Sequence, residues 1–164
     1  MRASQGRPGD IYWSLVEPIW SFVDVHGDPD EFLTEFGVLV KEVGLLFAAH
    51  WCQSEVCNGG FHQFFYNGTG VLAPEAVEGF RAIGLADCAD IIQQAMNLFG
   101  DEYPRDHSAR LEALDQELNQ KAFQPLDNRF FALLENDRFE RAADEYARNL
   151  RALGTKLESR LRSQ

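Results

Sequence analysis

Apolar residues recur at intervals of three and four along almost the whole of this chain, and that spacing restricts the fold more than any other feature of the sequence. The first segment shows it at Tyr12, Leu15, Val16, Ile19 and Trp20. Such intervals place side chains on one face of a helix, whereas a half-buried strand needs strict alternation, which no segment shows convincingly. The sequence therefore predicts an all-α fold, a single compact domain of about seven or eight helices.

The length and the apolar content fit one domain. The chain has 164 residues, of which 45% are hydrophobic, and this is enough for one sizeable core. We expect residues 1–9 to form a loose N-terminal leader and residues 10–164 the single all-helical domain, because no apolar stretch of a secretory signal follows Arg2 and Arg7. The longest apolar run, at 43–49, is far shorter than the roughly 20 residues that cross a bilayer, so a cytoplasmic protein without a membrane partner is expected.

Capping and stop residues predict where the helices begin and end. The run Asp28-Pro29-Asp30-Glu31 combines an N-cap, a proline at the first helical position and a glutamate at the third. The helix that it opens is expected to reach about residue 57, with Gly37 or Gly44 as a candidate break, and to end at Asn58-Gly59-Gly60. The other predicted helices are 10–25, bent near Pro18, about 60–67, 74–83, 86–99, 106–118 capped by Asp106, about 123–135, and 138–161 with a capping box at Asp137 and Glu140.

The acidic residues are concentrated in one part of the chain. Between Asp10 and Glu102 there are fifteen Asp or Glu and only two basic residues, Lys41 and Arg81, which leaves a net charge of −13 on this segment against −11 for the whole chain. The segment is also rich in apolar residues, so it belongs to the folded domain and is not a disordered acidic tail. With a pI near 4.7 the chain repels nucleic acid, and we expect a basic protein partner and no direct nucleic-acid binding.

Helices can hold these carboxylates in rows, because acids three, four or seven positions apart lie on one face. A basic DNA-binding surface could then meet carboxylates where it otherwise meets phosphates. The alternative is an ordinary solubilising surface in which Asp28, Glu31 and Asp87 cap helices. The first predicted row is Asp24, Asp28, Asp30, Glu31, Glu35 and Glu42, and the second is Glu75, Glu78, Asp87, Asp90, Asp101 and Glu102.

The C-terminal stretch 148–164 has the opposite charge, with five basic residues and one acid, Glu158. One interpretation is a solvated helix end whose cations complement the helix dipole. The other is a docking arm for the acidic half of the chain or for a second subunit.

The densest local signal lies at residues 55–70, where a helix stop, a short new helix and a second glycine-rich stop follow one another. Phe61, Phe64 and Phe65 share one face and are expected to enter the core, while Gln63 and Asn67 lie one turn apart on another face. Side-chain amides in this position suit the unpaired backbone groups at helix ends. We interpret the run as a rigid structural corner, with a ligand or catalytic pocket as the alternative.

This run resembles a known family. The similarity rests on Glu55, Asn58-Gly59-Gly60-Phe61, Gln63-Phe64-Phe65 and Asn67, followed by a Gly70-x-x-Ala73-Pro74-Glu75-Ala76 helix opening and an Ile83-Gly84 stop. These residues resemble the bacterial domain of unknown function shared with the DNA-mimic protein family, most strongly over 50–100 and from about 35 to 150 in all. The resemblance implies an all-helical cytoplasmic protein, often dimeric. It also implies one precedent, an acidic dimer that imitates duplex DNA and occupies the DNA-binding face of a transcription regulator.

Two other classes of site are weighed against this one. The chain has no nucleophile elbow, zinc-protease motif, phosphate-binding loop or dinucleotide fingerprint, and the best catalytic set is Glu55 with Asn58, His62 and Gln63. His50, Cys52, Cys57 and His62 are zinc-binding residue types, but Cys52 and Cys57 diverge by about 140° around a helix. We therefore expect no catalysis, no cofactor and no metal.

The sequence as a whole predicts a non-enzymatic acidic domain that binds a basic protein and forms a homodimer. The hypothesis is a DNA mimic that occupies the DNA-binding surface of a transcription regulator or nucleoid protein. The alternative is an uncharacterised enzyme or small-ligand-binding protein with a pocket at the Glu55 to Asn67 motif.

Overall fold

The computed structural model describes residues 6–24, 28–116 and 118–162, and within these ranges it contains eight α-helices, two 3₁₀ helices and no strand. Helix accounts for 80% of the structure, which confirms the predicted all-α fold. The α-helices are α1 (Asp10–Val16), α2 (Pro29–Gly37), α3 (Lys41–Tyr66), α4 (Ala73–Ala82), α5 (Ala86–Asn97), α6 (His107–Gln116), α7 (Gln120–Leu133) and α8 (Arg138–Arg162). The 3₁₀ helices are η1 (Glu17–Ser21) and η2 (Gly68–Leu72).

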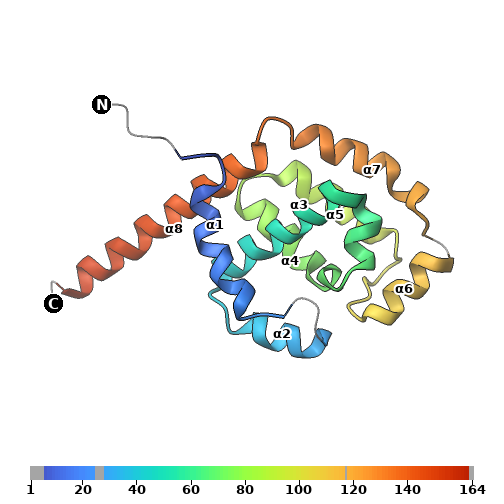
Figure 1. The fold of residues 1–164 in the computed structure, drawn as a ribbon, viewed down its shortest axis with the longest axis horizontal. Coiled ribbons are helices and arrows are strands. Elements are labelled where there is room, and N and C mark those ends of the chain that lie inside the picture. Colours follow the sequence, from blue (N-terminus) through green and yellow to red (C-terminus); the bar gives the residue numbers. More distant parts are fainter. Residues whose placement is uncertain (1–5, 25–27, 117, 163–164) are drawn as a thin grey trace.

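Helix α3 is the centre of the arrangement (Figure 1). It packs against α4 and α7, α5 packs against α4 and α7, and α1 lies against α8. Helix α2 lies at the periphery, and the C-terminal half of α8 extends away from the body (Figure 1). None of the helices in the described ranges is long and apolar enough to cross a membrane.

The predicted breaks in the N-terminal helices differ from the observed ones in detail. The segment expected as one bent helix is α-helical only to Val16 and continues through Pro18 as a 3₁₀ helix, since proline supplies no amide for the α-helical pattern. The helix that starts at Asp28 ends after Gly37 and not at Gly44. Gly44 is buried inside α3, where an added Cβ would lie 3.2 Å from the ring of Phe36.

Aromatic rings connect the central helix to its neighbours. Phe61, Phe64 and Phe65 of α3 are fully buried, as the sequence predicts. The ring of Phe61 meets that of Phe130 in α7 edge-on, with centroids 5.3 Å apart, and Phe80 of α4 lies 5.6 Å from Phe130. Edge-on and tilted ring pairs of this kind add to the stabilisation that burial of their area provides. The core is therefore continuous from α3 to α4 and α7.

Helix α1 receives its N-terminal cap from the other end of the chain. The carboxylate of Asp144 in α8 accepts hydrogen bonds from the amides of Gly9 (2.9 Å), Ile11 (3.0 Å) and Tyr12 (2.9 Å). Asp144 is buried, and among the described residues near the start of α1 no side chain supplies a cap. The first amides of a helix need acceptors, so this one carboxylate fixes α1 on α8.

The capping box predicted for the last helix is wrong. Asn136 and Asp137 both have left-handed backbone angles, with φ of 60° and 56°, and within the described residues no amide donates to the Asp137 carboxylate. The chain turns sharply here because α7 ends at Leu133 and α8 must begin at Arg138. Asn and Asp are the residues that tolerate this backbone region best after glycine.

His50 gives the fold a dependence on pH. It lies in α3 among the rings of Tyr12, Trp13, Trp20 and Trp51, with centroids 5.2 to 6.1 Å away. Burial lowers the pKa of His50 from 6.5 to about 4. Its Nδ1 lies 3.2 Å from the Tyr12 hydroxyl, and that nitrogen loses its ability to accept a hydrogen bond when the ring is protonated.

We predict that acidification destabilises the protein through this group. Between pH 6.5 and about 4 the unfolded chain binds a proton at His50 and the folded chain does not, so the free energy of unfolding falls as the pH falls. The expected loss from pH 7.5 to pH 5 is up to about 2 kcal/mol for this residue. Urea unfolding at both pH values measures this loss in the free energy of unfolding. The loss should be smaller by that amount in His50→Gln, and equal losses in the two proteins would contradict the prediction.

Candidate functional site

The glycine pair of the motif interrupts α3 with a sharp bend and divides it into two helical halves. Gly59 has φ −150° and ψ 19°, and Gly60 has φ 77° and ψ 178°, so the backbone leaves helical angles for two residues and resumes at Phe61. The stop predicted at Asn58-Gly59-Gly60 and the new helix after it are therefore confirmed, and α3 consists of two helices that meet at this kink. Gly60 is required here, because a Cβ at its left-handed φ would lie 2.7 Å from an oxygen of Asp127.

Asp127 of α7 caps the second half of α3. Its Oδ1 accepts the amide of Phe61 at 2.8 Å, the first amide after the bend. Asp127 is buried, and burial raises its pKa, while the Phe61 amide and the nearby His62 act in the opposite direction. The sequence analysis did not single out Asp127, because a carboxylate that serves an amide 66 residues away has no local signature.

The carboxylate of Glu55 accepts hydrogen bonds from the polar side chains of the motif. Its Oε2 accepts the side-chain amides of Gln63 (2.7 Å) and Asn67 (2.9 Å), and its Oε1 accepts the hydroxyl of Thr69 at 3.3 Å. The Asn58 amide donates to Gln63 Oε1 at 3.3 Å. Glu55 is only 8% exposed, so the network replaces the water that the carboxylate loses. The structure thus brings the predicted motif residues together and adds Thr69.

Arg110 of α6 is a third buried charged residue at this corner, after Asp127 and Glu55. It is fully buried and donates to four backbone carbonyls, those of Phe65 (3.1 Å), Asn67 (3.4 Å), Pro104 (3.4 Å) and Arg105 (2.5 Å). Loss of solvent lowers its pKa. Two of these carbonyls belong to the end of α3, which a helix leaves without partners. Arg110 therefore joins α6 to the motif, and the sequence analysis missed it.

Of the candidate catalytic set, Glu55, Gln63 and Asn58 are linked by hydrogen bonds, whereas His62 lies outside this network. Both oxygens of Glu55 accept hydrogen bonds from motif side chains, and no hydrogen bond in the described structure joins Glu55 to His62. The His62 ring stacks on Tyr66, with centroids 6.2 Å apart. A pocket of about 330 Å³ lies outside the bend, lined by residues that include Asn58, Gly60 and His62, and Glu55 is not part of its wall.

The candidate metal ligands are also dispersed. Cys52 is fully buried and Cys57 is exposed, which places them on different sides of α3. Burial raises the pKa of both thiols, and a thiol with a raised pKa is a poor nucleophile and a poor metal ligand. No group of three or more His, Cys, Asp or Glu in the described ranges is placed to hold a metal ion.

The second acidic row is largely neutralised by ion pairs. Arg105 binds Glu75 with two hydrogen bonds of 2.8 and 2.9 Å. The other pairs are Lys41 with Glu78 (3.8 Å), Arg138 with Asp87 (2.9 Å) and Arg81 with Asp90 (2.7 Å). Asp101 and Glu102 are exposed and form no ion pair with a described basic residue. Four of its six carboxylates therefore already face a cation.

The first acidic row differs in this respect. Asp28 caps α2, accepting the amides of Asp30 (3.0 Å) and Glu31 (3.3 Å), and the Asp24 amide lies 3.3 Å from Glu35 Oε2. Asp30, Glu31 and Glu42 are exposed. No basic residue of the described ranges forms an ion pair with Asp28, Asp30, Glu31, Glu35 or Glu42. This row lies mainly on α2, at the edge of the molecule (Figure 1).

This geometry defines the class of the protein. It is an all-helical domain with a buried polar corner and an acidic helix at its edge. Residues 39–150 match the family described as DMP19-like protein, and the chain therefore belongs to the DMP19-like family. This is the DNA-mimic family that the motif predicts. No curated protein and no solved structure matches the chain. The whole motif lies inside the matched range, whereas α1, η1 and α2 lie before it.

We predict that the bend does not tolerate a side chain at position 60. Gly60→Ala should lower the free energy of unfolding by about 2 kcal/mol or more, because the new Cβ meets both a left-handed φ and the Asp127 carboxylate. Chemical unfolding measures the change. Gly37→Ala is the matched control, since nothing lies within 4 Å of its added Cβ, and it should leave the free energy of unfolding unchanged or raise it by up to about 1 kcal/mol, because alanine is the better helix former. Equal effects at the two positions would refute the role of the bend.

A second prediction concerns the Glu55 network. Glu55→Gln should lower the free energy of unfolding by only about 1 to 2 kcal/mol. The loss is small because the Thr69 hydroxyl can turn and accept a hydrogen bond from the new side-chain amide. Glu55→Leu should cost about 3 kcal/mol or more, because the amides of Gln63 and Asn67 then lose their acceptor. Urea unfolding measures both changes. If Glu55→Leu is as stable as the unchanged protein, the motif is not a structural corner and the ligand-pocket alternative gains support.

Proposed function

We propose that this protein is a non-enzymatic, acidic protein-binding domain that acts as a DNA mimic. Its partner is a basic DNA-binding protein, a transcription regulator or nucleoid protein of the cytoplasm. The surface that meets the partner is the first acidic row: Asp24, Asp28, Asp30, Glu31, Glu35 and Glu42. Membership of the DMP19-like family supports the proposal. The observation that carries it is that five of these six carboxylates form no ion pair with a described basic residue.

Ion pairing decides which acids a partner can use. Where a carboxylate already faces an arginine, an incoming cation must displace that arginine, and the gain in free energy is small. Asp30, Glu31 and Glu42 require no such exchange. The charge of the chain also steers a basic surface toward them before contact, because its net value is −11. The second row is therefore secondary in this proposal.

The non-enzymatic part of the proposal rests on the Glu55 network. The strongest acid–base candidate of the motif is held by three side-chain donors and is removed from solvent. A general acid or base must reach the proton that it transfers, and the hydrogen-bond partners of Glu55 separate its carboxylate from a substrate in solution. The family resemblance further implies a homodimer, which would present the acidic row twice.

The test is capture of the partner at two salt concentrations. Immobilised protein should retain a basic DNA-binding protein from host lysate at about 50 mM salt and lose most of it at about 500 mM, since screening shortens the Debye length to a few ångströms. Nonspecific duplex DNA should release the same protein, because it competes for the same cationic surface.

Charge-neutral variants locate the surface. Asp30→Asn, Glu31→Gln and Glu42→Gln together should reduce capture at least about tenfold and change stability by less than about 0.5 kcal/mol per site. The control is Glu112→Gln, Asp115→Asn and Glu135→Gln, three exposed acids outside the row with the same total change in charge. Capture that ignores salt, or that falls equally in both triple variants, would show that the acidity is only a solubilising surface.

A further inference from the structure

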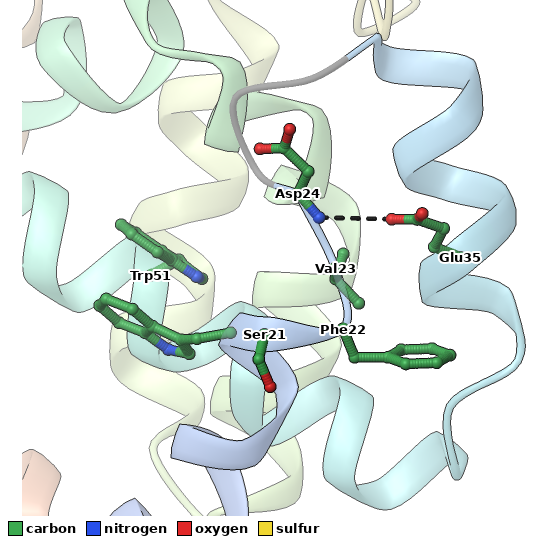
Figure 2. Close-up of a pocket in the computed structure, with 7 residues that line it drawn as sticks. Ser21, Phe22, Val23, Asp24, Glu35 and Trp51 are labelled. Atoms are coloured by element: carbon green, nitrogen blue, oxygen red, sulfur yellow. Dashed lines mark hydrogen bonds between the residues drawn. The ribbon is translucent and has the colours of Figure 1, made fainter.

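An aromatic pocket lies between η1, the residues that follow it and α3. It has a volume of about 390 Å³ and is lined by Trp20, Ser21, Phe22, Val23, Asp24, Glu35 and Trp51. Figure 2 shows residues 21–24 crossing the pocket, with Trp51 on one side and Glu35 of α2 on the other. The volume lies within the range of about 300 to 1,000 Å³ that small organic groups occupy in proteins. The motif does not contribute to this pocket, and the proposed function uses only two of its lining residues, Asp24 and Glu35.

Two indoles form one wall. The rings of Trp20 and Trp51 stack, with centroids 4.9 Å apart and planes inclined by 21°. Trp20 remains 46% exposed and Phe22 56% exposed, although large aromatic side chains are usually covered in a protein without a partner. The faces of these rings carry partial negative charge and attract cations.

The polar groups of the pocket specify a ligand more narrowly. The carboxylates of Asp24 and Glu35 are both in its lining, and no described lining residue is basic. The Glu35 side chain points from α2 toward the 21–24 segment, where its Oε2 lies 3.3 Å from the Asp24 amide (Figure 2). The nearby His50 carries no charge at neutral pH, because burial lowers its pKa to about 4. The electrostatic character of the pocket is therefore acidic.

One buried donor has no acceptor. The indole nitrogen of Trp51 is buried and forms no hydrogen bond with the described protein. In Figure 2 it faces the side of the pocket on which Ser21 and Val23 lie. A buried N–H without a partner is unfavourable, so a ligand that supplies an acceptor at this position gains affinity. A simple cation supplies no acceptor.

We propose that this pocket binds the side chain of an arginine from a partner protein. The planar guanidinium lies against the indole faces and donates to the carboxylates of Asp24 and Glu35, while a backbone carbonyl next to that arginine accepts the Trp51 N–H. Guanidinium combines a flat, stacking cation with several donors in one plane, and an ammonium has no such face. The inference goes beyond the acidic row, since it concerns one pocket and one side chain, and each can fail without the other.

Intrinsic fluorescence tests the proposal directly. The three tryptophans of the chain lie in one cluster, because Trp13 is 5.5 Å from Trp20 and Trp20 is 4.9 Å from Trp51, so their emission reports on this pocket. Titration with N-acetyl-arginine amide should give a saturable change in emission. N-acetyl-citrulline amide has the same shape without the charge and should bind at least about tenfold more weakly. Equal responses to the two amides, or no response to either, would overturn the proposal.

Three single variants assign the binding to these groups. Glu35→Gln keeps an acceptor for the Asp24 amide and should weaken binding of the arginine amide at least about fivefold. Trp51→Phe keeps a ring and removes the N–H, and it should also weaken binding. Glu42→Gln, in the acidic row but outside the pocket, should bind as the unchanged protein does. Binding that survives Glu35→Gln and Trp51→Phe together would place the amide elsewhere and refute the assignment.

The same set of variants distinguishes the proposed pocket from the proposed acidic row. A Trp51→Phe protein that still captures its partner with the same salt dependence, but binds the arginine amide more weakly, supports the pocket and leaves the acidic row intact. Absence of amide binding in the unchanged protein, together with salt-sensitive capture, refutes the pocket alone.

Discussion

The bend in α3 at Gly60 is the feature on which the other helices depend. It lets one helix enter the core along one direction and leave along another, so that its two halves bury different aromatic surfaces. The bend exposes backbone groups that must find partners away from water. Asp127 of α7 accepts the first amide after the bend, and Arg110 of α6 donates to carbonyls at the end of the helix. The positions of α6 and α7 follow from these bonds.

The sequence predicted those parts of the structure that local chemistry decides. Helices begin where Asp28 and Asp106 can cap them, and Asp106 accepts the Ala109 amide as expected. Spacing on a helix face predicted the burial of Phe61, Phe64 and Phe65 because a single element sets it. The same spacing placed Gln63 and Asn67 one turn apart, but their amides were expected to serve backbone groups at helix ends and donate to the Glu55 carboxylate instead.

Contacts between distant segments could not be predicted from local chemistry. Asp144 serves amides more than 130 residues away, and nothing in the sequence around it differs from an ordinary acid on an amphipathic helix. The residues around Arg110 in the sequence are likewise those of an ordinary surface arginine, and only the folded structure shows that Arg110 is buried. The capping box at Asp137 failed for a related reason: the short connection between α7 and α8 imposes left-handed angles, and this requirement overrides the local preference for a cap.

The same limit applies to charge. A count between Asp10 and Glu102 omits the basic residues that fold back from beyond it, and Arg105 and Arg138 neutralise Glu75 and Asp87 across 30 and 51 residues. What remains without such pairing is concentrated on α2, before the range that matches the family. The motif and the charge of the edge helix are thus separate properties of the chain, since the motif fixes the scaffold and the charged helix lies outside the matched range. Exposed carboxylates attract a basic surface from a distance but discriminate poorly among partners, whereas a pocket that encloses one side chain discriminates by shape and hydrogen bonding. The acidic row and the aromatic pocket share Asp24 and Glu35, so a partner drawn to the row by its charge would bring its arginines to the pocket that can select among them.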